Sequence, residues 1–152
     1  MLVLPLKVHR SVVAKFKRRC KELFPLENFG YLLGNKQLNS WEIAEIWIPE
    51  DIKNYVTSET IYWQNSWVSD VLEYCEEHDL TPLGSIHSHP YTYSEIKRRK
   101  TLPDHSTSEA DSLSGLTSEV HGICRVLESK TRRLTATVRF WGPELTVTTS
   151  YV

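Results

Sequence analysis

The sequence is poor in cysteine, has no long apolar run and shows no excess of charge of one sign. Its three cysteines, Cys20, Cys75 and Cys124, are widely spaced and odd in number, which argues against a disulfide framework or a zinc knuckle. The apolar runs are too short to cross a bilayer, and the first residues lack the basic start and the cleavage site of a signal peptide. We therefore expect a cytoplasmic protein that makes no membrane contact.

The charges nearly cancel, with 18 Lys and Arg against 19 Asp and Glu and a formal net charge of −1. This balance excludes the global basic field that is typical of nucleic-acid-binding proteins. A local basic run at 97–100 leaves a nucleic-acid-binding module as a rival hypothesis, to which the net charge gives little support. The length predicts one domain over residues 1–152, without linkers or repeats.

Hydrophobic periodicity predicts a chain that mixes helices and strands. In the first predicted helix Val13, Phe16 and Cys20 fall on one stripe, and Ser11 stands where an N-cap is expected. Helices packed on a curved mixed β-sheet, an α+β fold, are the natural architecture for this order of elements. The expected strands are 2–8, 29–33, 41–48, 82–86, 120–127, 134–141 and 145–152, and the expected helices are 12–23, 61–78 and 108–116.

The motif with the clearest chemistry is His87-Ser88-His89-Pro90. Two histidines at positions i and i+2 of an extended chain point to the same face, so both rings can bind one metal ion. Because Pro90 interrupts a regular strand ladder, we expect the pair at the end of a strand. A surface His-x-His at a turn is the alternative interpretation.

A carboxylate at Asp111 is the candidate third ligand. Two histidines and one carboxylate leave a fourth tetrahedral position open, which is typical of catalytic zinc sites. Ser108-x-x-Asp111 also fits a capping box at a helix start, so the pattern alone leaves both interpretations open.

Glu27 is the candidate proton carrier. It lies in the segment Pro25-Leu-Glu-Asn-Phe-Gly, and apolar surroundings tend to raise the pKa of a carboxyl group toward the range that suits proton transfer. An exposed loop glutamate is the alternative, and spacing alone does not bring Glu27 to His87.

Together these motifs resemble the JAMM, or MPN+, family of zinc metalloproteases, and in size the chain is similar to its small stand-alone prokaryotic or phage members. The resemblance covers roughly residues 1–150 and implies the MPN/JAB, or cytidine-deaminase-like, architecture. The matching pieces, in the order in which the family has them, are Pro25-x-Glu27-x-x-Gly30-x-Leu32-x-Gly34, Gly84-Ser-Ile-His87-Ser-His89-Pro90 and Ser108-x-x-Asp111.

The resemblance also implies a role for each of these residues. His87, His89 and Asp111 would bind one Zn²⁺ per chain, Glu27 would be the general base and acid, and Ser108 would donate a hydrogen bond to the oxyanion. The family hydrolyses the amide bond after the C-terminal tail of a ubiquitin or ubiquitin-like protein. The implied partner is therefore such a protein, as a conjugate or a precursor, in a bacterial ubiquitin-like (antiphage) system or as a sulfur-carrier-like protein. A non-catalytic MPN scaffold that binds a partner protein is the alternative.

One departure from the family is an insertion at about 91–107, between His89 and Ser108. It is either a solvated loop or a flap that contacts the substrate, and its Lys97, Arg98 and Arg99 would then meet acidic or phosphate groups. His105 lies in the same segment, but we rank it outside the ligand set because three ligands are already supplied.

Two further groups of side chains have a structural and a functional interpretation. Trp63 and Trp67 are expected mainly in the core, although on one helix they would also frame a groove for an extended peptide. His121 opens a predicted strand, where we expect an imidazole with satisfied hydrogen bonds rather than a metal ligand.

Overall fold

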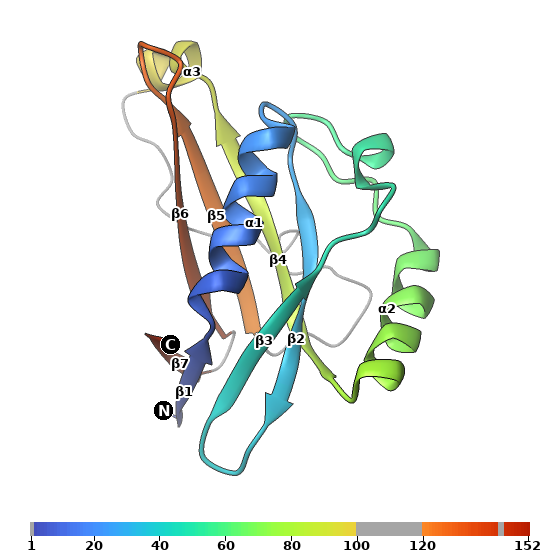
Figure 1. Cartoon of the computed structure of the whole chain (residues 1–152). Coiled ribbons are helices and arrows are strands. Elements are labelled where there is room, and N and C mark those ends of the chain that lie inside the picture. Colours follow the sequence, from blue (N-terminus) through green and yellow to red (C-terminus); the bar gives the residue numbers. More distant parts are fainter. Residues whose placement is uncertain (1, 100–119, 143–144) are drawn as a thin grey trace.

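The structure is a computed structural model that describes residues 2–99, 120–142 and 145–152 (Figure 1). It contains seven strands, three α-helices and one 3₁₀ turn within these residues. In chain order the elements are β1 (Leu2–Val8), α1 (Arg10–Leu23), β2 (Phe29–Lys36), β3 (Trp41–Trp47), η1 (Ile52–Tyr55), α2 (Asn65–His78), β4 (Thr81–Tyr91), α3 (Tyr93–Arg98), β5 (Val120–Glu128), β6 (Leu134–Trp141) and β7 (Leu145–Tyr151).

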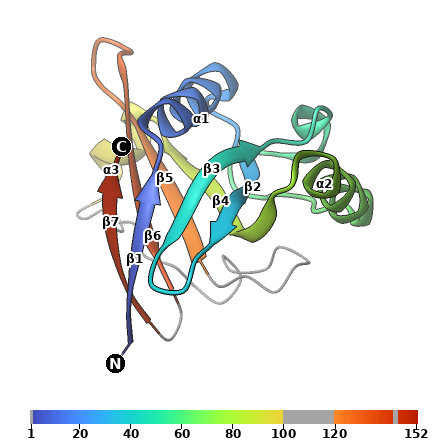
Figure 2. The same cartoon turned by 60° about the horizontal axis from the view of Figure 1, so that its bottom comes forward.

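All seven strands form one mixed sheet in the order β6-β5-β4-β2-β3-β1-β7. The pairs β1–β3, β1–β7 and β4–β5 are parallel, and the other neighbours are antiparallel. The sheet curves so strongly that it is nearly barrel-shaped, with β6 and β7 near each other (Figure 2). The predicted α+β class and the curved mixed sheet are confirmed.

Helix α1 packs on the inner face of this sheet, where it contacts β3, β5 and β6. Its predicted apolar stripe is confirmed, because Val13, Phe16, Cys20 and Leu23 are buried. They share one core with Leu6, Val8, Leu32, Ile43, Ile86, Cys124 and Val126 of the strands. Burial of such side chains stabilises the fold by roughly 1.5–3 kcal/mol each.

Helix α2 covers the opposite face of the sheet. Trp67, Val71 and Cys75 of the helix pack against a second core cluster that holds Phe29, Tyr31 and Leu33 of β2. The alternation of β2 explains this arrangement, since Leu32 points into the first core while its two neighbours point into the second.

Two predicted helix starts are wrong. Helix α1 begins at Arg10 with His9 at the N-cap, and no side chain caps it, so Ser11 is not the cap. Helix α2 begins at Asn65 rather than at Ile61. The reason is that Trp63 lies in an extended segment, where its Nε1–H donates to the Tyr31 hydroxyl at 2.8 Å.

Strand β4 is longer than predicted and continues through Pro90 to Tyr91. Its ladder with β2 ends at the pair Phe29–His87, whereas its ladder with β5 continues to Tyr91. Pro90 is tolerated because only one side of the strand still has a ladder at that point. The histidine pair therefore lies within a strand rather than after it, with His87 at the last pair of the β2 ladder and His89 beyond that ladder.

Helix α3 lies in a segment that we expected to be irregular. A capping box starts it, in which Glu95 N–H donates to the Thr92 side chain and the Glu95 carboxylate accepts from Thr92 N–H. The Thr-x-x-Glu spacing was the available signal. The helix expected over 108–116 lies outside the described residues.

No helix within the described residues is long and apolar enough to cross a membrane.

We expect Gly84→Ala to lower the free energy of unfolding by more than about 3 kcal/mol, because overpacking against a rigid neighbour is costly. A Cβ at Gly84 would stand 1.7 Å from the Val120 carbonyl oxygen in the β4–β5 ladder. Gly122→Ala is the matched control, with an expected loss of about 1 kcal/mol, because its Cβ would meet only side-chain atoms of Ile86 and Phe140 at 3.0 Å. Urea unfolding measures both, and equal losses would contradict the backbone clash.

Candidate metal centre

The candidate centre lies on the outer face of β4, where His87 and His89 point to the same side. Their Nε2 atoms are 3.0 Å apart, and the two rings are tilted by 59° with centroids 4.9 Å apart. Two nitrogens that each bind a tetrahedral Zn²⁺ at 2.0–2.1 Å are roughly 3.3 Å apart. The pair therefore fits a shared cation, and the surface-turn alternative does not describe it, because His87 is buried within a strand.

Ser88, between the two histidines, is bonded to Asn28, the residue just before β2. Asn28 N–H donates to Ser88 Oγ at 2.7 Å, and Ser88 N–H donates to the Asn28 carbonyl oxygen at 2.9 Å. The Asn28 amide also donates to Cys20 Sγ of α1 at 3.5 Å. Both Asn28 and Ser88 are fully buried. Their hydrogen bonds therefore hold the backbone of the residue between the two histidines in place.

Glu27 stands next to this pairing. Because Asn28 pairs with Ser88 and Phe29 with His87, the antiparallel register brings Glu27 beside His89. Its backbone N–H donates to the Thr57 carbonyl oxygen at 2.8 Å, and the residue is only 9% exposed. The structure thus brings Glu27 to the histidine strand, which the sequence spacing alone did not do, and the exposed-loop alternative is wrong.

His121 of β5 is a second buried imidazole on the same outer face. Its ring lies near that of Trp141 of β6, with centroids 5.8 Å apart and an angle of 31° between the ring planes. Burial lowers the pKa of His121, and charge on His87 lowers it further. Within the described part of the chain its Nδ1 has no hydrogen-bond partner, so these residues do not supply the hydrogen bond that we expected at this atom. A neutral imidazole here is a polar neighbour of the histidine pair that sequence reasoning missed.

The remaining residues of the predicted site are not among those that the structure describes. Ser108, Asp111 and His105 lie outside the described residues. Among residues 2–99, 120–142 and 145–152, no group of three or more His, Cys, Asp or Glu side chains is arranged to hold a metal ion. The described part of the centre therefore consists of the two histidines with Glu27 beside them.

Three of the candidates for substrate contact, Lys97, Arg98 and Arg99, lie on or next to α3. Arg98 and Arg99 line a polar pocket of about 440 Å³ with Glu59, Thr92 and Glu95, just beyond the end of β4. Lys97 of the same helix lies over the Tyr93 ring.

The two tryptophans have different positions. Trp67 lies in the core, as mainly expected, because it is 1% exposed and stacks on Phe29, so the alternative of a peptide groove does not describe it. Its Nε1–H donates to Asp51 at 2.9 Å, which satisfies the buried indole. Trp63 stays half-buried and bonded to Tyr31.

Comparison with known sequences adds one family. The family described as prokaryotic homologs of the JAB domain matches residues 9–95, a span that contains Glu27, His87 and His89. No curated protein sequence matches the chain.

Two solved structures have a similar fold. The solution structure of a protein from Desulfitobacterium hafniense has a TM-score of 0.58 at 11% identity, covering 96% of this chain and 94% of that chain. The crystal structure of a JAB1/MPN domain protein from Archaeoglobus fulgidus has a TM-score of 0.48 at 19% identity, covering 93% and 97%. The first of these likenesses establishes a shared fold.

We expect Ser88→Ala to lower the free energy of unfolding by about 1–3 kcal/mol, because it leaves the buried Asn28 N–H without its acceptor. Ser85→Ala is the control, since Ser85 is a buried serine of the same strand, and it should cost less. Thermal or urea unfolding measures the difference. If Ser85→Ala costs as much as Ser88→Ala, the Asn28–Ser88 bond does not hold the two strands in register.

Proposed function

Because the chain belongs to the family of prokaryotic homologs of the JAB domain, we propose that it is a zinc-dependent isopeptidase or peptidase. The bond hydrolysed is the amide that follows the C-terminal tail of a ubiquitin or ubiquitin-like protein. The observation that carries the proposal is the convergence of the His87 and His89 Nε2 atoms to 3.0 Å on the buried outer face of β4.

In this proposal His87 and His89 hold one Zn²⁺, and Asp111 is the third ligand that the family resemblance implies. Bound Zn²⁺ supplies Lewis acidity toward the scissile carbonyl and lowers the pKa of water toward ~7. The contribution of the chain is to present two imidazoles at fixed positions, which the Asn28–Ser88 bonds behind them secure.

Glu27 moves the proton. Its carboxylate takes a proton from the attacking water and returns it to the nitrogen of the leaving amine, so one residue acts first as base and then as acid. Support comes from its place beside His89 and from its burial, which shields the carboxylate from bulk water. Ser108 is proposed to donate a hydrogen bond to the oxyanion, a contact that commonly contributes ~2.7–4 kcal/mol to lowering the barrier.

The substrate approaches past the end of β4, where α3 begins. We assign the contact with its charged groups to Arg98 and Arg99, because these side chains line the pocket that adjoins this strand end. The tail itself is proposed to lie extended and to pair with a strand edge, as peptides commonly do on β-proteins. A solvated loop over 91–99 is a poorer description, since α3 is capped and tied to β5 through Tyr93 N–H and Glu128.

Metal content is the first test. We expect about one Zn²⁺ per chain in the wild type and loss of this zinc in His89→Ala, because structural and catalytic zinc sites need their full ligand set. His78→Ala is the control, since His78 is exposed at the end of α2. Mass-spectrometric metal analysis gives the ratio. A wild-type protein that neither contains nor takes up zinc would instead be a non-catalytic scaffold that binds a partner.

We expect Glu27→Gln to keep its zinc and to lose about 10²–10⁴-fold in turnover, because the amide cannot accept the proton of the attacking water. Glu22→Gln, an exposed position of α1, should retain full turnover. The assay follows release of a fluorophore linked by an amide bond to the C terminus of ubiquitin or of bacterial ubiquitin-like and sulfur-carrier-like proteins. Full turnover by zinc-loaded Glu27→Gln would remove Glu27 from the mechanism.

A further inference from the structure

Helix α1 carries a concentration of positive charge that the proposed peptidase function does not use. Its 14 residues hold six cations and one anion, a net charge of +5, so the rest of the chain carries −6 to give the total of −1. Arg10, Lys15, Arg18 and Lys21 are exposed, and Lys17 and Arg19 are half-buried. Helix α2, on the other face of the sheet, holds four anions and no Lys or Arg.

This charge has little compensation nearby. Within the described part of the chain, Arg19 is the only one of the six cations with a carboxylate partner, Glu22 at 3.3 Å. The acidic side chains of the adjacent strand β3 are engaged elsewhere, because Glu42 binds His9 and Glu45 accepts from the Tyr74 hydroxyl. A positive potential therefore extends from α1 into solvent.

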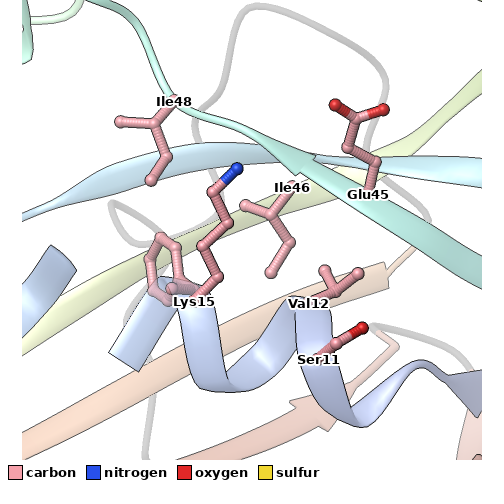
Figure 3. A pocket seen from close by; sticks show the side chains of 7 residues that line it. Ser11, Val12, Lys15, Glu45, Ile46 and Ile48 are labelled. Carbon is pink, nitrogen blue, oxygen red and sulfur yellow. The ribbon is translucent and has the colours of Figure 1, made fainter. Parts of the chain in front are cut away.

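Two hollows with a mainly apolar lining flank the helix. The larger, of about 520 Å³, lies toward β6 and β7, and Val13, Ala14 and Val138 line it together with Arg10 and Lys17. The smaller, of about 190 Å³, lies toward β3, where Ile46 and Ile48 face Val12 and Lys15 (Figure 3). A cavity of ~150 Å³ accepts a benzene-sized group, so each hollow has room for an apolar side chain.

From this arrangement we infer that α1 is a docking surface for an acidic segment of a partner protein, whose apolar side chains enter the two hollows. The cations of α1 attract the acidic residues of the partner segment, and the apolar lining of the two hollows accepts the apolar side chains that lie between those acidic residues. The surface is separate from the candidate metal centre, because α1 packs on the inner face of the sheet and His87 and His89 lie on the outer face.

Other anionic partners fit this surface less well. An amphipathic helix inserts into a membrane through its apolar face, but the apolar face of α1 is buried in the core. Single-stranded nucleic acids are held by several exposed aromatic rings on which successive bases stack. Phe16 of α1 is buried, and Tyr151 is the one exposed ring among the described residues that line the two hollows.

The test uses a fluorescein-labelled peptide in which leucines interrupt a run of glutamates, with binding followed by fluorescence anisotropy. The variant combines Lys15→Glu, Arg18→Glu and Lys21→Glu, and the matched control combines Lys53→Glu, Lys130→Glu and Arg133→Glu. All six positions are exposed, and both variants change the net charge equally. Circular dichroism checks that both variants keep their helices and strands.

We expect the α1 variant to bind the peptide at least about tenfold more weakly than the wild type does. The control variant should bind it less than about twofold more weakly, and the wild-type affinity should fall with added salt. Replacement of the peptide's glutamates by glutamines should abolish binding, and replacement of its leucines by serines should weaken it several-fold.

Four outcomes would overturn the inference. The first is no binding by the wild type, and the second is equal weakening in both variants, which would be an effect of net charge alone. The third is tighter binding of a DNA duplex or of phosphatidylserine vesicles than of the peptide. The fourth is α1-dependent self-association in sedimentation experiments without peptide binding, since the acidic α2 of a second copy would then be the occupant. None of these readouts depends on zinc or on turnover, so the inference and the proposed peptidase function fail separately.

Discussion

The antiparallel pairing of β2 with β4 is the constraint on which both the core and the candidate metal centre depend. The two strands exchange backbone hydrogen bonds up to Phe29 and His87, and Asn28 and Ser88 extend the contact by one further pair. Since side chains alternate along a strand, this register decides which residues face inward. A slip of one residue would turn His87 and His89 into the apolar core and Ile86 out of it.

The same pairing explains why a site forms at this point. Strand β2 begins at Phe29 while β4 runs on beside β5 to Tyr91, so one side of β4 is uncovered just where His89 stands. The chain that enters β2 brings Glu27 to this uncovered side, next to the histidines. The candidate metal centre and the proposed proton carrier thus lie together because the β2 ladder ends where both stand.

Local patterns in the sequence were sufficient to predict much of this. The stripe Val13, Phe16 and Cys20 predicted α1, and the three strands expected over 120–127, 134–141 and 145–152 correspond to β5, β6 and β7. The spacing of His87 and His89 predicted that they share a face. What local patterns do not contain is the order of strands in the sheet, because the parallel pairing of β4 with β5 joins segments that are distant in the chain. The start of α2 at Asn65, later than predicted, depends likewise on β2, because Trp63 bonds to Tyr31 of that strand.

The separation of charge between α1 and α2 follows from the two-faced sheet. Each helix buries one apolar face in a different core, so each presents its charged face on a different side of the molecule. A partner held at α1 therefore lies on the other side of the sheet from His87. Its effect on hydrolysis would come from the higher local concentration of a tethered substrate, which appears in KM while kcat stays constant.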